Sequence, residues 1–414
     1  MNGDLLIVAP YLPWPDDFGG AIRIYQIVRH LAARRNVILL APATQREMNA
    51  LDHLRDICDV TAVPVDWTFR QPASVAKRVA QFRSMGARTS FVESASFESR
   101  IQAVMDRLFM TRQIELVQYE FPQMALYRPP RPCPTILDSH NIEHDLLRRV
   151  AMTHDAITGR IFNAIEWRKV RRLERAAWSS VTLNVATSSR DALAIEEADR
   201  RPVAIVPNGV DVEAFASARH CQRVAGRVVF IGAMRHQPNA NGARWYIENV
   251  HPRVRVAVPH ATLELVGADP PRDLVNQTDD SIAVSANVAS VMPHLGRAEV
   301  AIVPLHAGGG TRLKILEAFA AGVPVVSTTV GVEGIDAVPG CDLLVADSTV
   351  AFADAVIQIL RHTDLPAQYS KENAIDLVRS RHDWGSAIIP LLEEAHREAH
   401  ARFHAKGGTD VKAR

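Results

Sequence analysis

The sequence predicts an α/β protein made of two doubly wound, open parallel sheets that follow one another along the chain. Short apolar runs alternate with longer amphipathic segments, which is typical of strands and helices that alternate in a parallel sheet. The alternation stops at an irregular polar stretch after residue 205 and then starts again. With 414 residues, the chain is long enough for two or three domains that each bury a core.

Each set of apolar runs gives one predicted sheet. The first sheet is expected to use residues 4–9, 36–41, 59–65, 114–118 and 134–138. The second is expected to use residues 227–232, 261–267, 281–285, 299–304, 323–328 and 342–346. The turn signal Pro207-Asn208-Gly209 lies between the two sets. We therefore expect a first domain over 1–205, a second over 206–382, a C-terminal helix over 383–405 that packs back towards the first domain, and a tail over 406–414.

Composition excludes several classes of protein. The 47 basic and 46 acidic residues give a net charge of +1, whereas a dedicated nucleic-acid binder needs a basic excess. The four cysteines lack zinc-ligand spacing, so free thiols in a reducing compartment are expected. No apolar run approaches the roughly 18 residues of a membrane span, and the short run after Asp4 fits neither a signal peptide nor an anchor. We expect a cytoplasmic protein.

The most informative segment spans residues 299–328. A strand ends at Pro304, and a turn of three glycines follows, namely Gly308, Gly309 and Gly310. Thr311 is a suitable N-cap for the next helix, which is expected to run to about Ala321. Arg312 and Lys314 oppose the helix dipole at this end, so a bound phosphate is the natural partner of the free amides and the two cations.

Glu317 lies one to two turns deeper in the same helix, where its carboxylate can accept hydrogen bonds from ribose hydroxyls. A phosphate site next to a ribose site suggests a nucleotide. The alternative is that Arg312, Lys314 and Glu317 form a solvated helix face. The segment lacks the Gly-Lys-Ser/Thr ending of a Walker loop, which disfavours ATP hydrolysis.

The segment GGGTRLKILEAFAAGVPVVST, with VPNGVD upstream and LVGADP between them, resembles the retaining nucleotide-sugar glycosyltransferases of the GT-B fold. This large bacterial family is called group 1 or family 4. The resemblance covers nearly the whole chain and is strongest over residues 299–328. It implies two facing Rossmann-like domains with a cleft between them, in which the second domain binds the donor.

In that family a pair of glutamates eight positions apart flanks this turn. The resemblance places Glu317 at the second position, on the ribose, but Gly309 stands at the first, where the family's glutamate contacts the donor sugar. The chain thus resembles a GGGTRLK branch of the family, in which backbone amides and a different residue are expected to contact the sugar.

The first domain contributes a glycine pair, Gly19 and Gly20, just before a predicted amphipathic helix. Paired glycines let a ligand approach backbone amides closely. The resemblance implies a loop that faces the donor phosphate and the acceptor. A purely structural turn is the alternative, and the glycines lie too far from the strand for a dinucleotide fingerprint.

Polar residues also crowd the loop after the strand that ends at Asp138. Such clusters at the carboxyl end of a strand are a common place for function. The resemblance implies that His140 faces the donor sugar. The alternative is a capping role for this loop, in which Ser139 or Asn141, followed by Glu143, starts the next helix.

Basic residues gather at two further places in the sequence. In the family, an arginine and a lysine near the turn after residue 232 bind pyrophosphate. Arg235 is the candidate for the arginine here, and the lysine is missing. His236 fits a surface position as well as it fits a site. A helix expected around residues 166–178 carries five Lys and Arg side chains. Its simplest interpretation is a solvated basic face, and it leaves a peripheral contact with the inner membrane face open.

These observations predict a glycosyltransferase that moves a sugar from a nucleoside-diphosphate sugar to a glycan, a lipid-linked molecule or a small molecule. No Asp-x-Asp triplet occurs, so neither a metal nor another cofactor is expected, and Arg312 and Lys314 should stabilise the leaving diphosphate. Retention of configuration is implied by the resemblance. A nucleotide-sugar epimerase of the same fold and a non-catalytic nucleotide-sugar-binding protein are the alternatives.

Overall fold

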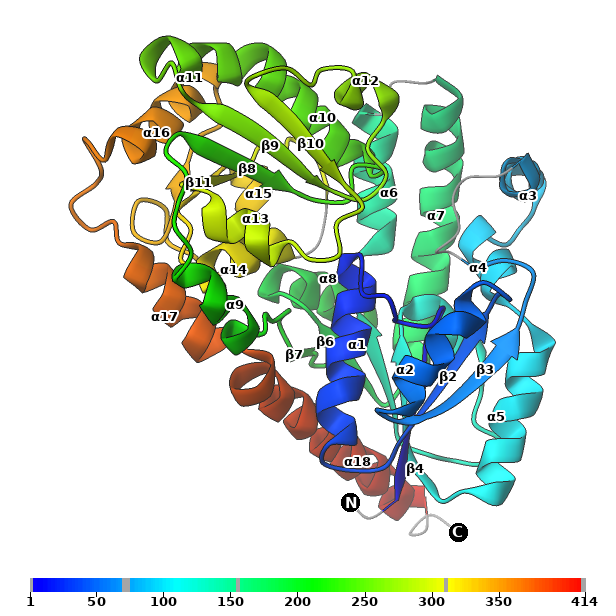
Figure 1. Ribbon diagram of the computed structural model, residues 1–414. Helices are drawn as coiled ribbons and strands as arrows, with labels where there is room; N and C mark the ends of the chain where they lie inside the picture. The colour runs from blue at the N-terminus through cyan, green and yellow to red at the C-terminus, as the bar shows by residue number, and fades with distance from the viewer. Residues whose placement is uncertain (1–2, 69–74, 154–156, 309–311, 411–414) are drawn as a thin grey trace. The chain divides into compact units, whose positions relative to one another are not determined.

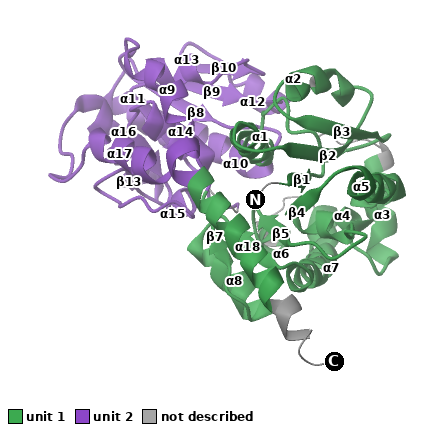
Figure 2. Ribbon diagram, turned by 90° about the horizontal axis from the view of Figure 1, so that it is seen from below, with its two compact units in different colours: residues 1–207, 389–414 green, residues 208–388 purple. Residues whose placement is uncertain are grey.

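The structure is a computed structural model that describes residues 3–68, 75–153, 157–308 and 312–410. The chain forms two compact units (Figure 2): Met1–Pro207 together with Ile389–Arg414, and Asn208–Ile388. The chain passes from the first unit to the second beside the predicted turn at Pro207-Asn208-Gly209, and returns six residues later than the sequence suggested.

The first unit contains a parallel sheet of seven strands in the order β3-β2-β1-β4-β5-β6-β7. The strands are β1 (Asp4–Val8), β2 (Val37–Ala43), β3 (Asp59–Pro64), β4 (Ile114–Glu120), β5 (Thr135–Ser139), β6 (Leu183–Ala186) and β7 (Ala204–Ile205). The five predicted strands are confirmed. β6 was not predicted, and β7 is only two residues long.

Helices connect these strands and cover the sheet (Figure 1). They are α1 (Gly19–Ala32), η1 (Glu47–Ala50), α2 (Leu51–Arg55), α3 (Val75–Gly86), α4 (Phe91–Ser96), α5 (Ser99–Thr111), η2 (Pro122–Leu126), α6 (Glu143–Thr153), α7 (Ile157–Ser180), α8 (Ser189–Asp199) and α18 (Ile389–Asp410). The long α7 presents its acidic side chains to the interior, because Glu166 and Glu174 are both buried.

The last helix, α18, belongs to the first unit although it follows the second in sequence. It is held there by an ion pair of 3.2 Å between Arg34 and Glu393 and by a buried hydrogen bond between His396 and Gln118. Helical backbone continues to Asp410, so the prediction of a tail from residue 406 was wrong. In the described part of the chain, no helix is long and apolar enough to cross a membrane.

The second unit contains a parallel sheet of six strands in the order β10-β9-β8-β11-β12-β13. All six predicted strands are confirmed as β8 (Arg227–Ile231), β9 (Thr262–Gly267), β10 (Ile282–Ala286), β11 (Val300–Val303), β12 (Val325–Ser327) and β13 (Leu344–Val345). These runs can be recognised in the sequence because parallel strands covered on both faces are mainly apolar.

The helices of the second unit surround one continuous hydrophobic core. They are α9 (Val212–Arg219), α10 (Gln237–Trp245), η3 (Tyr246–Val250), α11 (His251–Ala257), α12 (Arg272–Val275), α13 (Met292–Arg297), α14 (Leu313–Ala320), α15 (Thr329–Val332), α16 (Thr349–Arg361), α17 (Lys371–Arg381) and η4 (Trp384–Ile388).

Both strand orders reverse direction at one place. In the first unit the reversal lies between β1 and β4, and in the second between β8 and β11. In open α/β sheets, ligands bind beyond the carboxyl ends of the strands at such switch points. The residues that follow these four strands are therefore the first place to look for a site in each unit.

Candidate functional site

The glycine-rich turn of the second unit follows β11, at its switch point. Gly308 has a φ of 131°, a backbone conformation that favours glycine. Gly309, Gly310 and Thr311 lie outside the described residues. Helix α14 begins at Leu313, and the N-cap position is Arg312, without a side-chain cap. The prediction that Thr311 is the N-cap was therefore wrong by one position.

Lys314 is the second residue of α14 and reaches back towards the end of β8. Its Nζ donates a hydrogen bond of 2.8 Å to Oδ1 of Asn239, at the start of α10. The same Nζ lies 4.6 Å from the centre of the Phe230 ring. A side chain at Gly232 would place its Cβ only 2.7 Å from Nζ. The glycine after β8 thus makes room for the ammonium of Lys314.

The surroundings of Lys314 disfavour its charged form. Burial, together with the positive charge of Arg312, lowers the pKa of the Lys314 ammonium to about 7, although the Glu317 charge acts in the opposite direction. Arg312 is itself 7% exposed. Two basic groups held close together in a partly buried place are most stable when an anion is bound between or beside them.

The other predicted residues of this unit lie in less enclosed positions. Glu317 is half-buried, one turn beyond Lys314 on α14. Arg235 forms an ion pair of 2.9 Å with Asp269. His236 is exposed at the N-cap position of α10 and provides no side-chain cap. Arg235 would have to exchange Asp269 for a phosphate in order to bind pyrophosphate.

In the first unit the glycine pair opens α1 directly, with Phe18 as N-cap and no side-chain cap. Gly19 is exposed, and a Cβ on Gly20 would come within 2.5 Å of the Tyr11 hydroxyl and 3.1 Å of the Phe121 ring. Close packing of aromatic rings is thus one structural reason for glycine at position 20. The amides of this helix start lie beyond β1, at the switch point.

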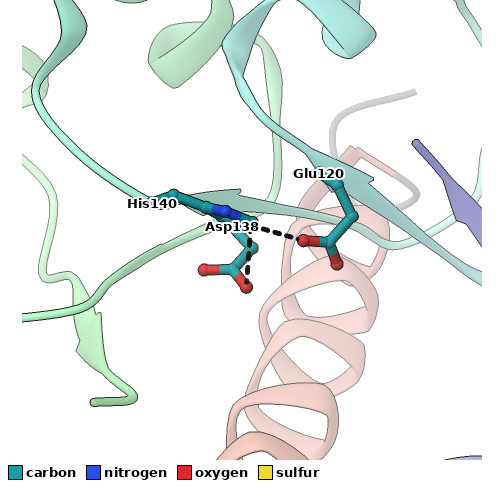
Figure 3. Close-up of side chains that lie close together, drawn as sticks. All are labelled: Glu120, Asp138 and His140. Atoms are coloured by element: carbon teal, nitrogen blue, oxygen red, sulfur yellow. Dashed lines mark hydrogen bonds and ion pairs between the residues drawn. The ribbon is translucent and has the colours of Figure 1, made fainter. Parts of the chain in front are cut away.

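His140 follows β5 and is almost fully buried. Its Nε2 lies 2.7 Å from Oε2 of Glu120, the last residue of β4, and 3.9 Å from Oδ2 of Asp138 (Figure 3). The ring packs on Phe121, with the ring centres 4.0 Å apart. Nδ1 is buried and has no hydrogen-bond partner among the described residues.

Asp138 is neutralised by an arginine that sequence reasoning missed. Arg23 of α1 donates two hydrogen bonds to its carboxylate, of 2.8 and 3.0 Å, and both side chains are almost completely buried. The same guanidinium donates to the backbone oxygens of Val206 and Pro207, each at 3.0 Å. The pair therefore ties the start of α1 to β5 and to the end of the first unit's main segment.

Phe121 adopts an uncommon backbone conformation. Its φ is 72° and its ψ is 148°, close to a region that is used almost only by glycine. Its amide donates to the oxygen of Asp138 at 3.1 Å, which fixes the chain at this point. Such a conformation costs about 1–3 kcal/mol and tends to occur at functional sites. Here it holds an aromatic ring between His140 and the start of α1.

The capping alternative for the His140 loop is not what the structure shows. Helix α6 begins at Glu143, and its first amides are capped by the Glu174 carboxylate of α7, with distances of 2.7 and 3.1 Å. Asn141 instead donates to the Glu143 side chain at 3.3 Å. Burial, together with the neighbouring Glu174 charge, raises the pKa of the Glu143 carboxyl to about 7.

One group of acids and histidine in the described residues is compact enough for a metal ion, namely Glu120, Asp138 and His140, whose ligand atoms lie within 4.8 Å of one another. All the carboxylate oxygens in this group already have hydrogen-bond partners. Both oxygens of Asp138 accept from Arg23, and those of Glu120 are bonded to Gln118 and His140. A divalent ion would have to share Asp138 with a guanidinium, which disfavours it.

The comparison with known protein families gives a partial match over the second unit. Residues 225–362 match the family described as glycosyl transferases group 1. The matched segment lies within the second unit. It includes β8 to β13 with α14, so the Lys314 side chain and its partner Asn239 both lie inside it.

A relative from Klebsiella pneumoniae, described as an uncharacterized 44.6 kDa protein in the cps region, is 25% identical over 177 residues. The match covers 40% of this chain and 45% of that relative, so the chain spans less than half the length of this curated relative.

Two solved structures extend the likeness to nearly the whole chain. Sucrose-phosphate synthase from Thermosynechococcus elongatus is 15% identical, with a TM-score of 0.68, covering 96% of this chain and 99% of that one. Anabaena Alr3699/HepE in complex with UDP and glucose is 14% identical, with a TM-score of 0.62, covering 95% of this chain and 99% of that one. At these identities the likeness shows the fold, which is GT-B, as predicted.

Proposed function

We propose that the protein is a glycosyltransferase that transfers the sugar of a nucleoside-diphosphate sugar to an acceptor hydroxyl, with retention of configuration and without a metal ion. The Lys314 ammonium at the switch point of the second sheet is the observation that carries this proposal. Its Nζ is held 2.8 Å from Oδ1 of Asn239, beside Arg312 at a helix start, where a bound anion would favour the charged form of a lysine whose pKa is lowered to about 7.

The nucleotide fits the same place chemically. A diphosphate would accept hydrogen bonds from Lys314, from Arg312 and from amides at the start of α14, and Glu317 would accept from the ribose hydroxyls. Glu317 lies about one turn beyond Lys314 in α14. The match to group 1 glycosyl transferases and the UDP bound in HepE support a nucleoside diphosphate as this ligand.

In the proposed reaction the bond between the sugar's anomeric carbon and the terminal phosphate oxygen breaks, and the diphosphate leaves with the bonding electrons. The acceptor oxygen forms a new bond to the same face of the sugar and gives its proton to the departing phosphate. Lys314 and Arg312 stabilise the charge that grows on the leaving group. His140 orients the sugar through a hydrogen bond and does not act as nucleophile or base.

A donor screen tests the function. The purified protein is mixed with UDP-glucose, UDP-N-acetylglucosamine, UDP-galactose and GDP-mannose, and melting temperatures are recorded with each sugar and with UDP and GDP. A ligand at 100 times its Kd stabilises the fold by about 2.7 kcal/mol, which is a shift of roughly 5–10 °C for units of this size. We expect one nucleotide to raise the melting temperature in this way.

Turnover is then measured as release of the nucleoside diphosphate in the presence of glycan or lipid-linked acceptors. Lys314→Ala is expected to abolish the nucleotide-induced shift and the release, while the basal melting temperature stays close to that of the parent. Lys371→Ala, at an exposed lysine at the start of α17, is the matched control and should behave like the parent. Unchanged nucleotide binding in Lys314→Ala would contradict the proposal.

The same samples separate the alternatives. An epimerase would convert one donor sugar into another without any acceptor, which proton NMR of the donor detects directly. A non-catalytic binding protein would show the melting shift but would consume no donor with any acceptor. Position 309 holds a glycine where the family has the glutamate that contacts the donor sugar. Binding without consumption of the donor would therefore indicate that this missing contact matters for catalysis.

A further inference from the structure

A chain of buried hydrogen bonds leads from the C-terminal helix to His140. Nε2 of His396 on α18 lies 2.7 Å from Oε1 of Gln118, and Nε2 of Gln118 lies 2.6 Å from Oε1 of Glu120. Oε2 of Glu120 lies 2.7 Å from Nε2 of His140. All four residues are at least 96% buried, so solvent does not compete for these bonds.

The direction of each bond in this chain follows from the carboxylate. A carboxylate oxygen can only accept, so the Gln118 amide group must donate to Glu120 through its nitrogen. Its oxygen then faces His396 and must accept a proton from Nε2 of that ring. Burial lowers the pKa of His396 to about 3, so this ring is neutral and carries its single proton on Nε2.

At the other end, Glu120 must also accept from His140. A neutral imidazole has one proton, and this contact places that proton on Nε2. Nδ1 is then a bare acceptor. It is buried, it has no partner among the described residues, and the ring that bears it packs on the backbone-strained Phe121. A buried acceptor without a partner costs about 1–3 kcal/mol, which a bound donor group would recover.

We propose that Glu120 is a positioning residue: it holds His140 with its proton on Nε2 and so presents Nδ1 as the acceptor of a hydrogen bond from a hydroxyl of the ligand. The identity of that ligand, the sugar of a nucleotide donor, rests on the proposed function. The proton position does not. The Arg23 pair with Asp138 keeps the second carboxylate near His140 occupied, so Glu120 alone decides the proton position.

The proposal can be tested by reversing the hydrogen-bond chain without changing its shape. In Glu120→Gln, the new amide must accept from Gln118 through its oxygen, so its nitrogen faces His140. A donor at that place requires an acceptor at Nε2, and the proton of His140 should move to Nδ1. In the exchange variant Gln118→Glu with Glu120→Gln, the carboxylate accepts from His396 and from the new amide, whose oxygen again faces His140.

The measurement is nitrogen NMR of the full-length protein with labelled histidines, without ligand, at pH 8. His140→Phe identifies the signals of His140 by their loss. We expect a protonated Nε2 in the parent, a protonated Nδ1 in Glu120→Gln, and a protonated Nε2 again in the exchange variant. Melting temperatures and circular dichroism establish that each variant is folded.

Three results would overturn the proposal: a protonated Nδ1 in the parent, no change in Glu120→Gln, or failure of a folded exchange variant to restore the parent pattern. A shift of both His140 nitrogens on addition of Zn²⁺ at a stoichiometry of one would also overturn it, since the cluster would then be a metal site.

A kinetic arm separates this inference from the proposed function. With the donor that the screen identifies, Glu120→Gln should lose on the order of 10- to 100-fold in kcat/KM, and the exchange variant should recover most of the loss. If the proton positions are as expected but no donor is ever consumed, the proposed function fails and the positioning role stands. If transfer occurs while His140 of the parent carries its proton on Nδ1, the proposed function stands and the positioning role of Glu120 fails.

Discussion

The proton affinity of Lys314 predicts how nucleotide binding depends on pH. In the free protein, burial and the nearby Arg312 charge lower the pKa of Lys314 to about 7, so the neutral amine predominates above that pH. A bound diphosphate favours the ammonium and returns its pKa towards the usual value near 10.4. Binding above pH 7 therefore requires that the protein take up a proton.

The size of the effect follows from the fraction of free protein that is already protonated. Half of the Lys314 side chains are charged at pH 7, about one in ten at pH 8 and about one in a hundred at pH 9. The Kd for UDP should therefore be about 5-fold weaker at pH 8 than at pH 7, and about 50-fold weaker at pH 9, which is a loss of roughly 2 kcal/mol. The second ionisation of a phosphate, near pH 6, is about nine-tenths complete at pH 7 and therefore changes little over this range.

Isothermal titration calorimetry in buffers of different ionisation enthalpy measures both the Kd for UDP and the number of protons taken up on binding. We expect an uptake of about 0.5 proton at pH 7 and about 0.9 proton at pH 8. Lys314→Met keeps the length of the side chain and removes the charge, so its Kd should be weaker at pH 7 and nearly constant up to pH 9. Lys371→Met should show the slope of the parent. A parent Kd that does not change between pH 7 and 9 would refute the reasoning.

Three further predictions concern single side chains. Gly232→Ala should weaken UDP binding about tenfold, because its Cβ would come within 2.7 Å of the Lys314 ammonium; unchanged binding would show that the ammonium is not confined there. Arg23→Met should destabilise the first unit by about 3–5 kcal/mol in urea unfolding, because Asp138 is left buried without its partner, and a loss below 1 kcal/mol would contradict this role. Glu143→Gln should raise the melting temperature at pH 8 more than at pH 5. The raised pKa of Glu143 means that the folded parent loses stability as pH rises from about 4.5 to 7, and an equal effect at both pH values would contradict it.

Much of the fold could be predicted because its strands are mainly apolar. β8 to β13 each form a run that no amphipathic helix would show, and every one was found. In the first sheet β6 was missed because the polar Asn184 interrupts its run, and the two-residue β7 was not among the predicted strands. The helix start was misplaced by one position because Thr311 is the better cap by residue type, whereas the N-cap position is Arg312, whose side chain does not cap α14.

The site was predicted less completely, and the reason is physical. Lys314 and His140 lie next to strong signals, a glycine turn and a strand end. Arg23, Asn239 and Glu120 were missed because their partners are distant in sequence: Arg23 pairs with a residue 115 positions away, and Asn239 with one 75 positions away. One signal was available for Glu120. Gln118 and Glu120 lie on the same face of β4 as the apolar Ile114 and Leu116, which indicates buried polar partners.

The most direct test of the central claim is a crystal structure of the protein with UDP. The account predicts that the diphosphate lies beyond β8 and β11, with the terminal phosphate within hydrogen-bond distance of the Lys314 Nζ and the ribose near Glu317. A diphosphate bound elsewhere, with the Lys314 ammonium still engaged only by Asn239, would contradict it.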